Sequence, residues 1–202
     1  MREPEHSFAG TAARAAAALA LAAALAAPAV AEPGMRVEIA RSGDAFMVDA
    51  HLVAPVPPRE AWAVLTDFEH MSAFVPNLVE SRVAGRSASR LTVAQKGVAR
   101  FGVVSFPFES VREVDLVPHE SVRSRTVGGT AGRVESFTRL AAAGAGTRIH
   151  YHLEVVPGFW FPGFVGEALL EQEVREQFEA IVQEMLRRQR AAAPPRAGAP
   201  AT

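Results

Sequence analysis

The stretch that decides the fold is VPPREAWAVLTDFEHMSAFVPNLVES, residues 56–81. Two prolines stand near its start, and proline in the first turn favours the beginning of a helix. A tryptophan and a leucine three residues apart then share one face, which predicts a short helix over residues 59–66. Asp67 is a residue type that caps helices, so a second short helix is expected over residues 68–74. The stretch therefore predicts two short helices in succession.

On both sides of this stretch, apolar and polar residues alternate, as they do in strands with one buried face. Residues 35–54 are interpreted as two strands around the turn Ser42-Gly43-Asp44. Residues 78–156 are interpreted as about six strands, one of them starting at Phe101, separated by turns that contain glycine or proline. Short connections between successive strands favour an antiparallel meander.

A long amphipathic helix is predicted over residues 163–190, where Val174, Phe178, Ile181, Val182 and Met185 form one apolar stripe. It is roughly 40 Å long, enough to cover a whole sheet, and a sheet with one apolar face needs such a cover. We therefore expect an α+β domain over residues 35–190. Its curved antiparallel sheet of about seven strands wraps on the long C-terminal helix, and two short helices follow the first strand region.

The two ends of the chain differ from this domain. Residues 1–31 combine a charged start, an alanine and leucine run and a small-residue end, which are the parts of a secretory signal peptide. The run is too short to span about 30 Å of hydrocarbon. We expect cleavage after Ala31 and a periplasmic mature protein that begins at Glu32. Residues 191–202 are small and proline-rich, so we expect a disordered tail.

Composition excludes several classes of function. The chain has 21 Lys and Arg against 22 Asp and Glu, so no generic binding of nucleic acid is expected. It has no cysteine, which excludes disulfides, thiolate catalysis and cysteine-ligated metal centres. It also lacks a G-x-S-x-G nucleophile elbow and a Walker A loop. We expect no cofactor.

The order of elements, the stretch over residues 56–81 and the sequence GTRIHYHLEVVP at residues 146–157 resemble the START-like, helix-grip (SRPBCC) superfamily. Polyketide cyclase/dehydrase-type proteins and coenzyme Q-binding (COQ10-type) domains are among its members. The resemblance covers about residues 46–188 and implies that the sheet grips the long helix around an apolar cavity. It further implies that the protein binds or carries an apolar small molecule or lipid.

Alternation along the strands assigns the cavity wall. On the last strand Ile149, Tyr151, Leu153 and Val155 share one face, which we expect to point inward. The resemblance implies a cavity on this inner face. The predicted ligand-binding residues come from the inward strand positions, the segment before the long helix and the helix itself: Leu91, Val93, Gln95, Val104, Phe106, Phe108, Arg112, Tyr151, Leu153, Phe164, Phe178 and Ile181. A fully packed core is the alternative. The family resemblance favours a cavity, and so do small inward residues that leave volume unfilled: Ser110, Ser124, Thr126, Ser136 and Thr138.

Arg112 is the large charged residue of this inward set. A buried arginine without a partner is costly, so its guanidinium is expected to meet a carboxylate or phosphate group of a ligand. The alternative is a β-bulge near Pro107 or beyond, which would switch the alternation and leave Arg112 in solvent.

Phe159, Trp160 and Phe161 precede the long helix in a segment bracketed by proline and glycine. We interpret them as a gate to the cavity; a plug of the core is the alternative, and transient contact with a membrane surface a third reading. The sequence His150-x-His152-x-Glu154 places three possible metal ligands on one strand face. That face is the outer one, where polar residues are expected anyway, so no metal site is predicted.

Three functions remain open at this point. The first is an exported carrier of an apolar ligand. The second is an enzyme of cyclase, dehydratase or hydrolase type, in which Arg112, Gln95 or Tyr151 polarises a bound carbonyl. The third is a non-catalytic accessory protein that acts through a partner. No catalytic residue is assigned.

Overall fold

The computed structural model describes residues 34–101, 104–158 and 166–193. The predicted signal peptide, the aromatic segment with Phe159, Trp160, Phe161 and Phe164, and most of the predicted tail lie outside these residues. The side chain of Val104 is outside the description as well.

A single antiparallel sheet of eight strands forms the larger layer, in the order β1-β2-β8-β7-β6-β5-β4-β3. The strands are β1 Arg36–Ser42, β2 Ala45–Ala54, β3 Leu78–Ser87, β4 Arg90–Phe101, β5 Val104–Val117, β6 Ser121–Gly129, β7 Gly132–Ala143 and β8 Gly146–Pro157. The meander from β3 to β8 is therefore confirmed. The sheet has one strand more than the expected seven or so, and Phe101 ends β4 rather than starting the next strand.

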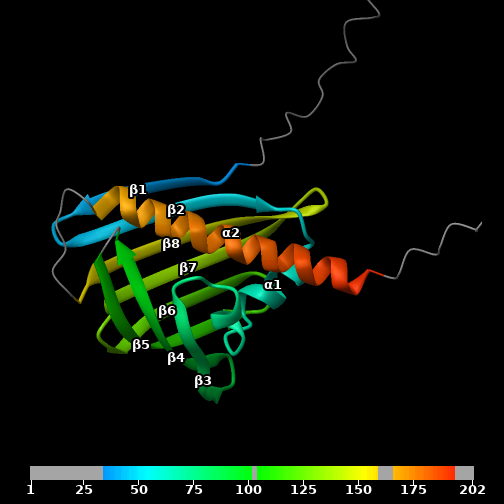
Figure 1. The fold of residues 1–202 in the computed structure, drawn as a ribbon. Helices are drawn as coiled ribbons and strands as arrows, with labels where there is room; N and C mark the ends of the chain where they lie inside the picture. Colours follow the sequence, from blue (N-terminus) through cyan, green and yellow to red (C-terminus); the bar gives the residue numbers. More distant parts are fainter. Residues whose placement is uncertain (1–33, 102–103, 159–165, 194–202) are drawn as a thin grey trace, which may run out of the picture. The chain divides into compact units, whose positions relative to one another are not determined.

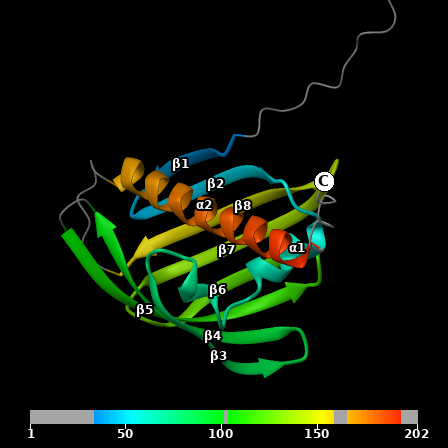
Figure 2. The same ribbon diagram turned by 45° about the vertical axis from the view of Figure 1, so that its right-hand side comes forward.

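The helices lie on one side of this sheet. Helix α1 spans Pro58–Leu65, η1 is a single 3-10 turn at Met71–Ala73, and α2 spans Gly166–Ala192. Figure 1 shows α2 crossing the concave face of the sheet, and Figure 2 shows α1 beside the end of α2. The predicted arrangement of a sheet gripping a long helix is confirmed. None of the described helices is long and apolar enough to cross a membrane.

The second short helix is wrong as predicted, because only the turn at η1 forms within residues 68–74. Asp67 does not cap it. The Asp67 carboxylate instead accepts a hydrogen bond from Arg188 of α2 at 2.7 Å and lies 2.7 Å from Nδ1 of His70. The residue that flanks the start of η1 is His70, and no described side chain caps this turn. Asp67 therefore ties the segment after α1 to α2.

The core lies between α2 and the sheet. Val48 of β2, Ile149 of β8 and Met185 of α2 are fully buried there. The predicted apolar stripe of α2 is confirmed, since Val174, Phe178, Ile181 and Met185 are buried and Val182 is half-buried. Each buried aliphatic or aromatic side chain contributes about 1.5–3 kcal/mol. Burial of this stripe therefore determines which face of α2 packs against the sheet.

Candidate functional site

Two adjoining chambers separate α2 from the middle of the sheet. The first, which we call the polar chamber, has a volume of about 240 Å³. The second, the apolar chamber, has about 230 Å³. Both are lined by Asn77, Phe108, Ala131, Val134, Tyr151 and Gln177, so they meet along this shared wall. The interior predicted as either packed or hollow is therefore hollow in this structure.

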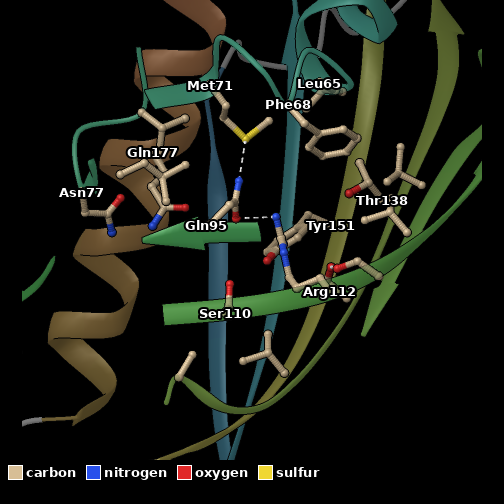
Figure 3. Close-up of a pocket in the computed structure, with 18 of the residues that line it drawn as sticks. Leu65, Phe68, Met71, Asn77, Gln95, Ser110, Arg112, Thr138, Tyr151 and Gln177 are labelled. Carbon is tan, nitrogen blue, oxygen red and sulfur yellow. Dashed lines mark hydrogen bonds between the residues drawn. The ribbon is translucent and has the colours of Figure 1, made fainter. Parts of the chain in front are cut away.

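The polar chamber takes its polar groups from the strands β4 to β8. Gln95, Ser110, Arg112, Ser124, Thr126, Ser136, Thr138 and Tyr151 line it, and Figure 3 shows several of them converging. Its opposite wall consists of apolar residues from α2 and from the segment around α1 and η1: Leu65, Phe68, Met71, Val75, Phe178 and Ile181. Small hydroxyl residues at the inner face of the sheet leave the space that larger side chains would fill.

Arg112 lies in this chamber because the β-bulge at this point is on β6, the strand that pairs with β5, and not on β5 itself. The pairing of β5 with β6 shifts between Val111 and Arg112, which leaves Val127 of β6 as the extra residue, half exposed. The alternation along β5 is preserved, so Ser110, Arg112 and Val114 all line the chamber. A bulge does occur near Arg112, but it does not turn Arg112 outward.

A short chain of hydrogen bonds orients Arg112. Its Nη2 donates to Oε1 of Gln95 at 2.6 Å (Figure 3). Nε2 of Gln95 donates to Oγ of Ser81 at 2.9 Å. The same Nε2 lies 3.6 Å from the sulfur of Met71. The amide of Gln95 is thereby fixed with its oxygen toward Arg112, and Gln95 serves as a positioning residue.

The guanidinium of Arg112 is short of acceptors. Its Nε is buried and has no hydrogen-bond partner among the described residues. Burial lowers the pKa of Arg112 below its usual range, and Tyr151 partly offsets this. Burial likewise raises the pKa of the Tyr151 phenol, against the effects of Arg112 and of a hydrogen bond with Ser136. Arg112 remains a cation, because an arginine keeps its proton in proteins.

The hydroxyl groups that line the chamber differ in their hydrogen-bond partners within the protein. Ser124 and Ser136 are hydrogen-bonded to each other at 2.9 Å. Thr126 accepts a hydrogen bond from the N–H of Val134 at 2.7 Å and donates to the carbonyl of Gly132 at 3.0 Å. Thr126 therefore holds β6 and β7 together beyond their regular pairing, and its hydroxyl is engaged by backbone.

The apolar chamber lies toward the start of α2. Its wall includes Phe46, Leu153, Val155, Leu170 and Val174. Tyr151 packs edge-on against Phe178 where the two chambers meet, with ring centroids 5.1 Å apart.

One acidic residue lines the described part of the apolar chamber. The carboxylate of Glu173 accepts a hydrogen bond from Nδ2 of Asn77 at 2.5 Å. Burial raises the pKa of Glu173. The two chambers therefore differ in their ionisable groups, with the guanidinium of Arg112 in one and the carboxyl group of Glu173 in the other.

Most of the described residues that were predicted for the cavity line it. Gln95, Phe108, Arg112, Tyr151, Phe178 and Ile181 line the polar chamber, and Phe108, Tyr151 and Leu153 line the apolar one. Val93 is fully buried in the packed core, and Leu91 packs against it half-buried. Phe106 lines neither chamber. The prediction that these three residues line the cavity is therefore wrong. They share the inner face of the sheet with the cavity residues, but the space between α2 and the sheet does not extend to them.

The sequence reasoning missed the residues that close the chamber at the α1 end. Leu65, Phe68, Met71 and Val75 line it although no strand carries them, and Asn77 reaches the boundary of both chambers. The apolar residues within residues 65–75 were a usable signal, since a segment crossing the open end of a curved sheet buries its apolar side chains there. Gln177, one position before the buried Phe178, had no distinguishing signal.

The histidines of β8 lie on the outer face, as predicted. Nε2 of His150 and Nδ1 of His152 lie 3.2 and 3.0 Å from one oxygen of Asp49 on β2. Burial acts to raise the pKa of Asp49, but hydrogen bonds with His152 and His150 outweigh it and lower the pKa. Glu154 pairs with Arg133 instead. Across the described ranges, no group of three or more His, Cys, Asp or Glu side chains is arranged to hold a metal ion.

Comparisons with known proteins agree with this architecture. A family model described as "Polyketide cyclase / dehydrase and lipid transport" matches residues 54–182. No curated protein sequence matches the chain.

Several solved structures share the fold. A STAR-related lipid transfer protein from Xanthomonas axonopodis is similar at a TM-score of 0.65 with 13% identity, covering 77% of this chain and 95% of that one. The Zhui aromatase/cyclase from Streptomyces sp. R1128 gives 0.59 with 18% identity, covering 79% and 99%. A START superfamily protein from Mycobacterium smegmatis gives 0.59 with 15% identity, covering 70% and 97%. At these identities the likeness shows the fold alone.

Proposed function

Because the chain belongs to the polyketide cyclase/dehydrase and lipid transport family, we propose that it binds and carries an apolar small molecule or lipid between α2 and the sheet. The observation that carries this proposal is the pair of adjoining chambers, which have apolar walls and a few placed polar groups. Ligand sites in proteins combine these two features. Burial of a methylene contributes about 0.8 kcal/mol, so an apolar body of moderate length needs no catalytic machinery to be held.

A neutral fluorescent probe tests binding directly. N-phenyl-1-naphthylamine is expected to gain fluorescence on mixing with the protein. Val134 lines both chambers, so Val134→Trp fills the space and should reduce the signal at least tenfold. Val127→Trp is the matched control, because Val127 is half exposed. Val134→Phe is a smaller filler if the first variant does not fold. Equal fluorescence in the filled and control variants would refute an internal site.

We also propose that the carrier is exported. The amino-acid pattern of residues 1–31 supports this. When the full chain is produced in a bacterium, the mature protein should be recovered from the periplasmic fraction with Glu32 at its N-terminus. Recovery of the uncleaved chain from the cytoplasm would contradict export while leaving ligand binding untouched. Transient contact with a membrane through residues 159–164 is part of the same proposal.

A cyclase- or dehydratase-type enzyme is the second candidate, favoured because Tyr151 and Arg112 line one chamber and are electrostatically coupled there. In that reading Arg112 polarises a carbonyl and Tyr151 moves a proton. The two candidates differ in the fate of the ligand. A carrier returns its ligand chemically unchanged, whereas a dehydratase returns a product lighter by one water and a cyclase returns a ring-closed isomer, separable by chromatography, or its dehydrated form. Tyr151→Phe should abolish that conversion without abolishing binding.

A further inference from the structure

We propose that the ligand is a monocarboxylic acid on an apolar body, held with its carboxylate at Arg112 and its apolar end in the apolar chamber. This inference rests on the proposed function and names the class and direction of its ligand. The starting observation is that Arg112 has neither a counter-ion nor enough hydrogen-bond acceptors in the described lining of its chamber.

The first step is that Arg112 lacks a counter-ion. Among the described residues that line the polar chamber, Arg112 is the only charged one. Gln95 accepts one hydrogen bond from it, and its Nε has no acceptor. A guanidinium carries five N–H donors, and an unpaired buried charge is costly. A ligand that brings a negative charge and hydrogen-bond acceptors to Arg112 would offset the free energy cost of burying the guanidinium.

The second step is the choice of anion. One cation in the described lining balances one negative charge. A carboxylate carries a single charge and matches the planar fork of arginine with two oxygens. A phosphate monoester carries about −1.5 to −2 at neutral pH and would leave an uncompensated charge in the chamber. The phenol of Tyr151 lines the same chamber (Figure 3) and interacts electrostatically with the guanidinium.

The third step is direction. The described lining of the apolar chamber holds no cation, and its one acidic side chain, Glu173, gives a ligand carboxylate no counter-charge. The rest of that chamber is bounded mainly by apolar side chains, among them Phe46, Leu153, Val155 and Leu170. The carboxylate therefore lies at Arg112, and the apolar body passes Tyr151 along the shared wall.

The test is displacement of N-phenyl-1-naphthylamine at pH 8 by matched ligands: dodecanoic acid and dodecan-1-ol. Wild-type protein should prefer the acid at least tenfold, the effect of a hydrogen-bonded charge. Arg112→Met should reduce the preference to under about twofold while still binding the probe. Arg125→Met is the matched control, because Arg125 is exposed and paired with Glu113, and it should keep the preference. Arg112→Gln replaces the first variant if that does not fold.

Abietic acid and its alcohol, abietinol, form a second arm that distinguishes fused-ring acids from straight-chain acids. A preference for the acid in either arm supports the proposal, and no preference in either arm overturns it. The direction is tested by Leu170→Trp, which should weaken dodecanoic acid at least tenfold and hexanoic acid by under about twofold. Equal weakening of both acids would overturn the direction. Failure of wild-type protein to bind the probe would instead refute the proposed function.

Discussion

Replacing Arg112 by methionine should make the unliganded protein more stable. The change removes a buried guanidinium whose Nε has no partner, and it leaves Oε1 of Gln95 without its donor. The effective cost of burying one ion is several kcal/mol, whereas an orphaned acceptor costs about 1–3 kcal/mol. Because the side chain borders a cavity, the full cost of burial does not apply. We expect a net gain of about 1–2 kcal/mol in the free energy of unfolding.

The assay is urea unfolding, with calorimetry, of protein stripped of bound ligand. For a domain of this size the melting temperature should rise by about 3–6 °C. Arg125→Met, which removes a guanidinium from an exposed ion pair with Glu113, should change the unfolding free energy by less than about 1 kcal/mol. A fall in the melting temperature of Arg112→Met would mean that the guanidinium stabilises the empty protein, and the reasoning about a missing counter-ion would be refuted.

Two further predictions concern the framework of the site. A Cβ added at Gly97 would clash with the carbonyl oxygen of Asn77 and lie 2.5–2.7 Å from ring atoms of Phe108, so Gly97→Ala should destabilise the fold by about 1–3 kcal/mol in urea unfolding. Gly85→Ala meets only ordinary contacts and should show a smaller change. Hydrogen bonds from Arg187 and Arg188 lower the pKa of Glu184 from 4.5 to about 2. Since the folded pKa is the lower one, this stabilisation is present above pH 4.5 and is lost as the pH falls toward 2. The shift corresponds to roughly 3 kcal/mol, and we expect about half of it because the Arg187 side chain is largely exposed. Acid unfolding of Glu184→Gln should lack this part of the pH dependence, and an unchanged acid profile would contradict the assignment.

The fold followed from the sequence because its signals are local and repeated. Period-two alternation from residue 78 to 156 and helical spacing from residue 166 onward are each carried by many residues, so single exceptions do not change the interpretation. The position of β1 and β2 needed more than local pattern. β2 pairs with β8 at the far end of the meander, β1 pairs with β2 at the edge, and the segment containing α1 carries the chain across to β3.

The site was predictable to the extent that it lies on strands. Alternation placed Gln95, Arg112 and Tyr151 on the inner face, where they line the polar chamber. It did not separate cavity wall from packed core, because Val93 shares the inner face with Gln95 and yet is fully buried in contact with the core. Alternation along strands also could not identify cavity residues that lie outside strands, such as Phe68.

The capping prediction at Asp67 failed for a related reason. Local sequence identifies residues able to cap a helix, but it does not identify the distant side chains that bind the same carboxylate. Arg188 stands at the other end of the chain and binds Asp67 at 2.7 Å. A contact between residues so far apart in sequence has no signature in the residues around Asp67.

Native mass spectrometry of the protein, extracted from its producing cells without detergent, tests the central claim most directly. Wild-type protein should retain an apolar guest of a few hundred daltons that is released on denaturation. Val134→Trp should lose that guest, and Val127→Trp should keep it. Detection of wild-type protein at its bare polypeptide mass alone, or of the same guest at equal occupancy in Val134→Trp, would contradict a ligand held between α2 and the sheet.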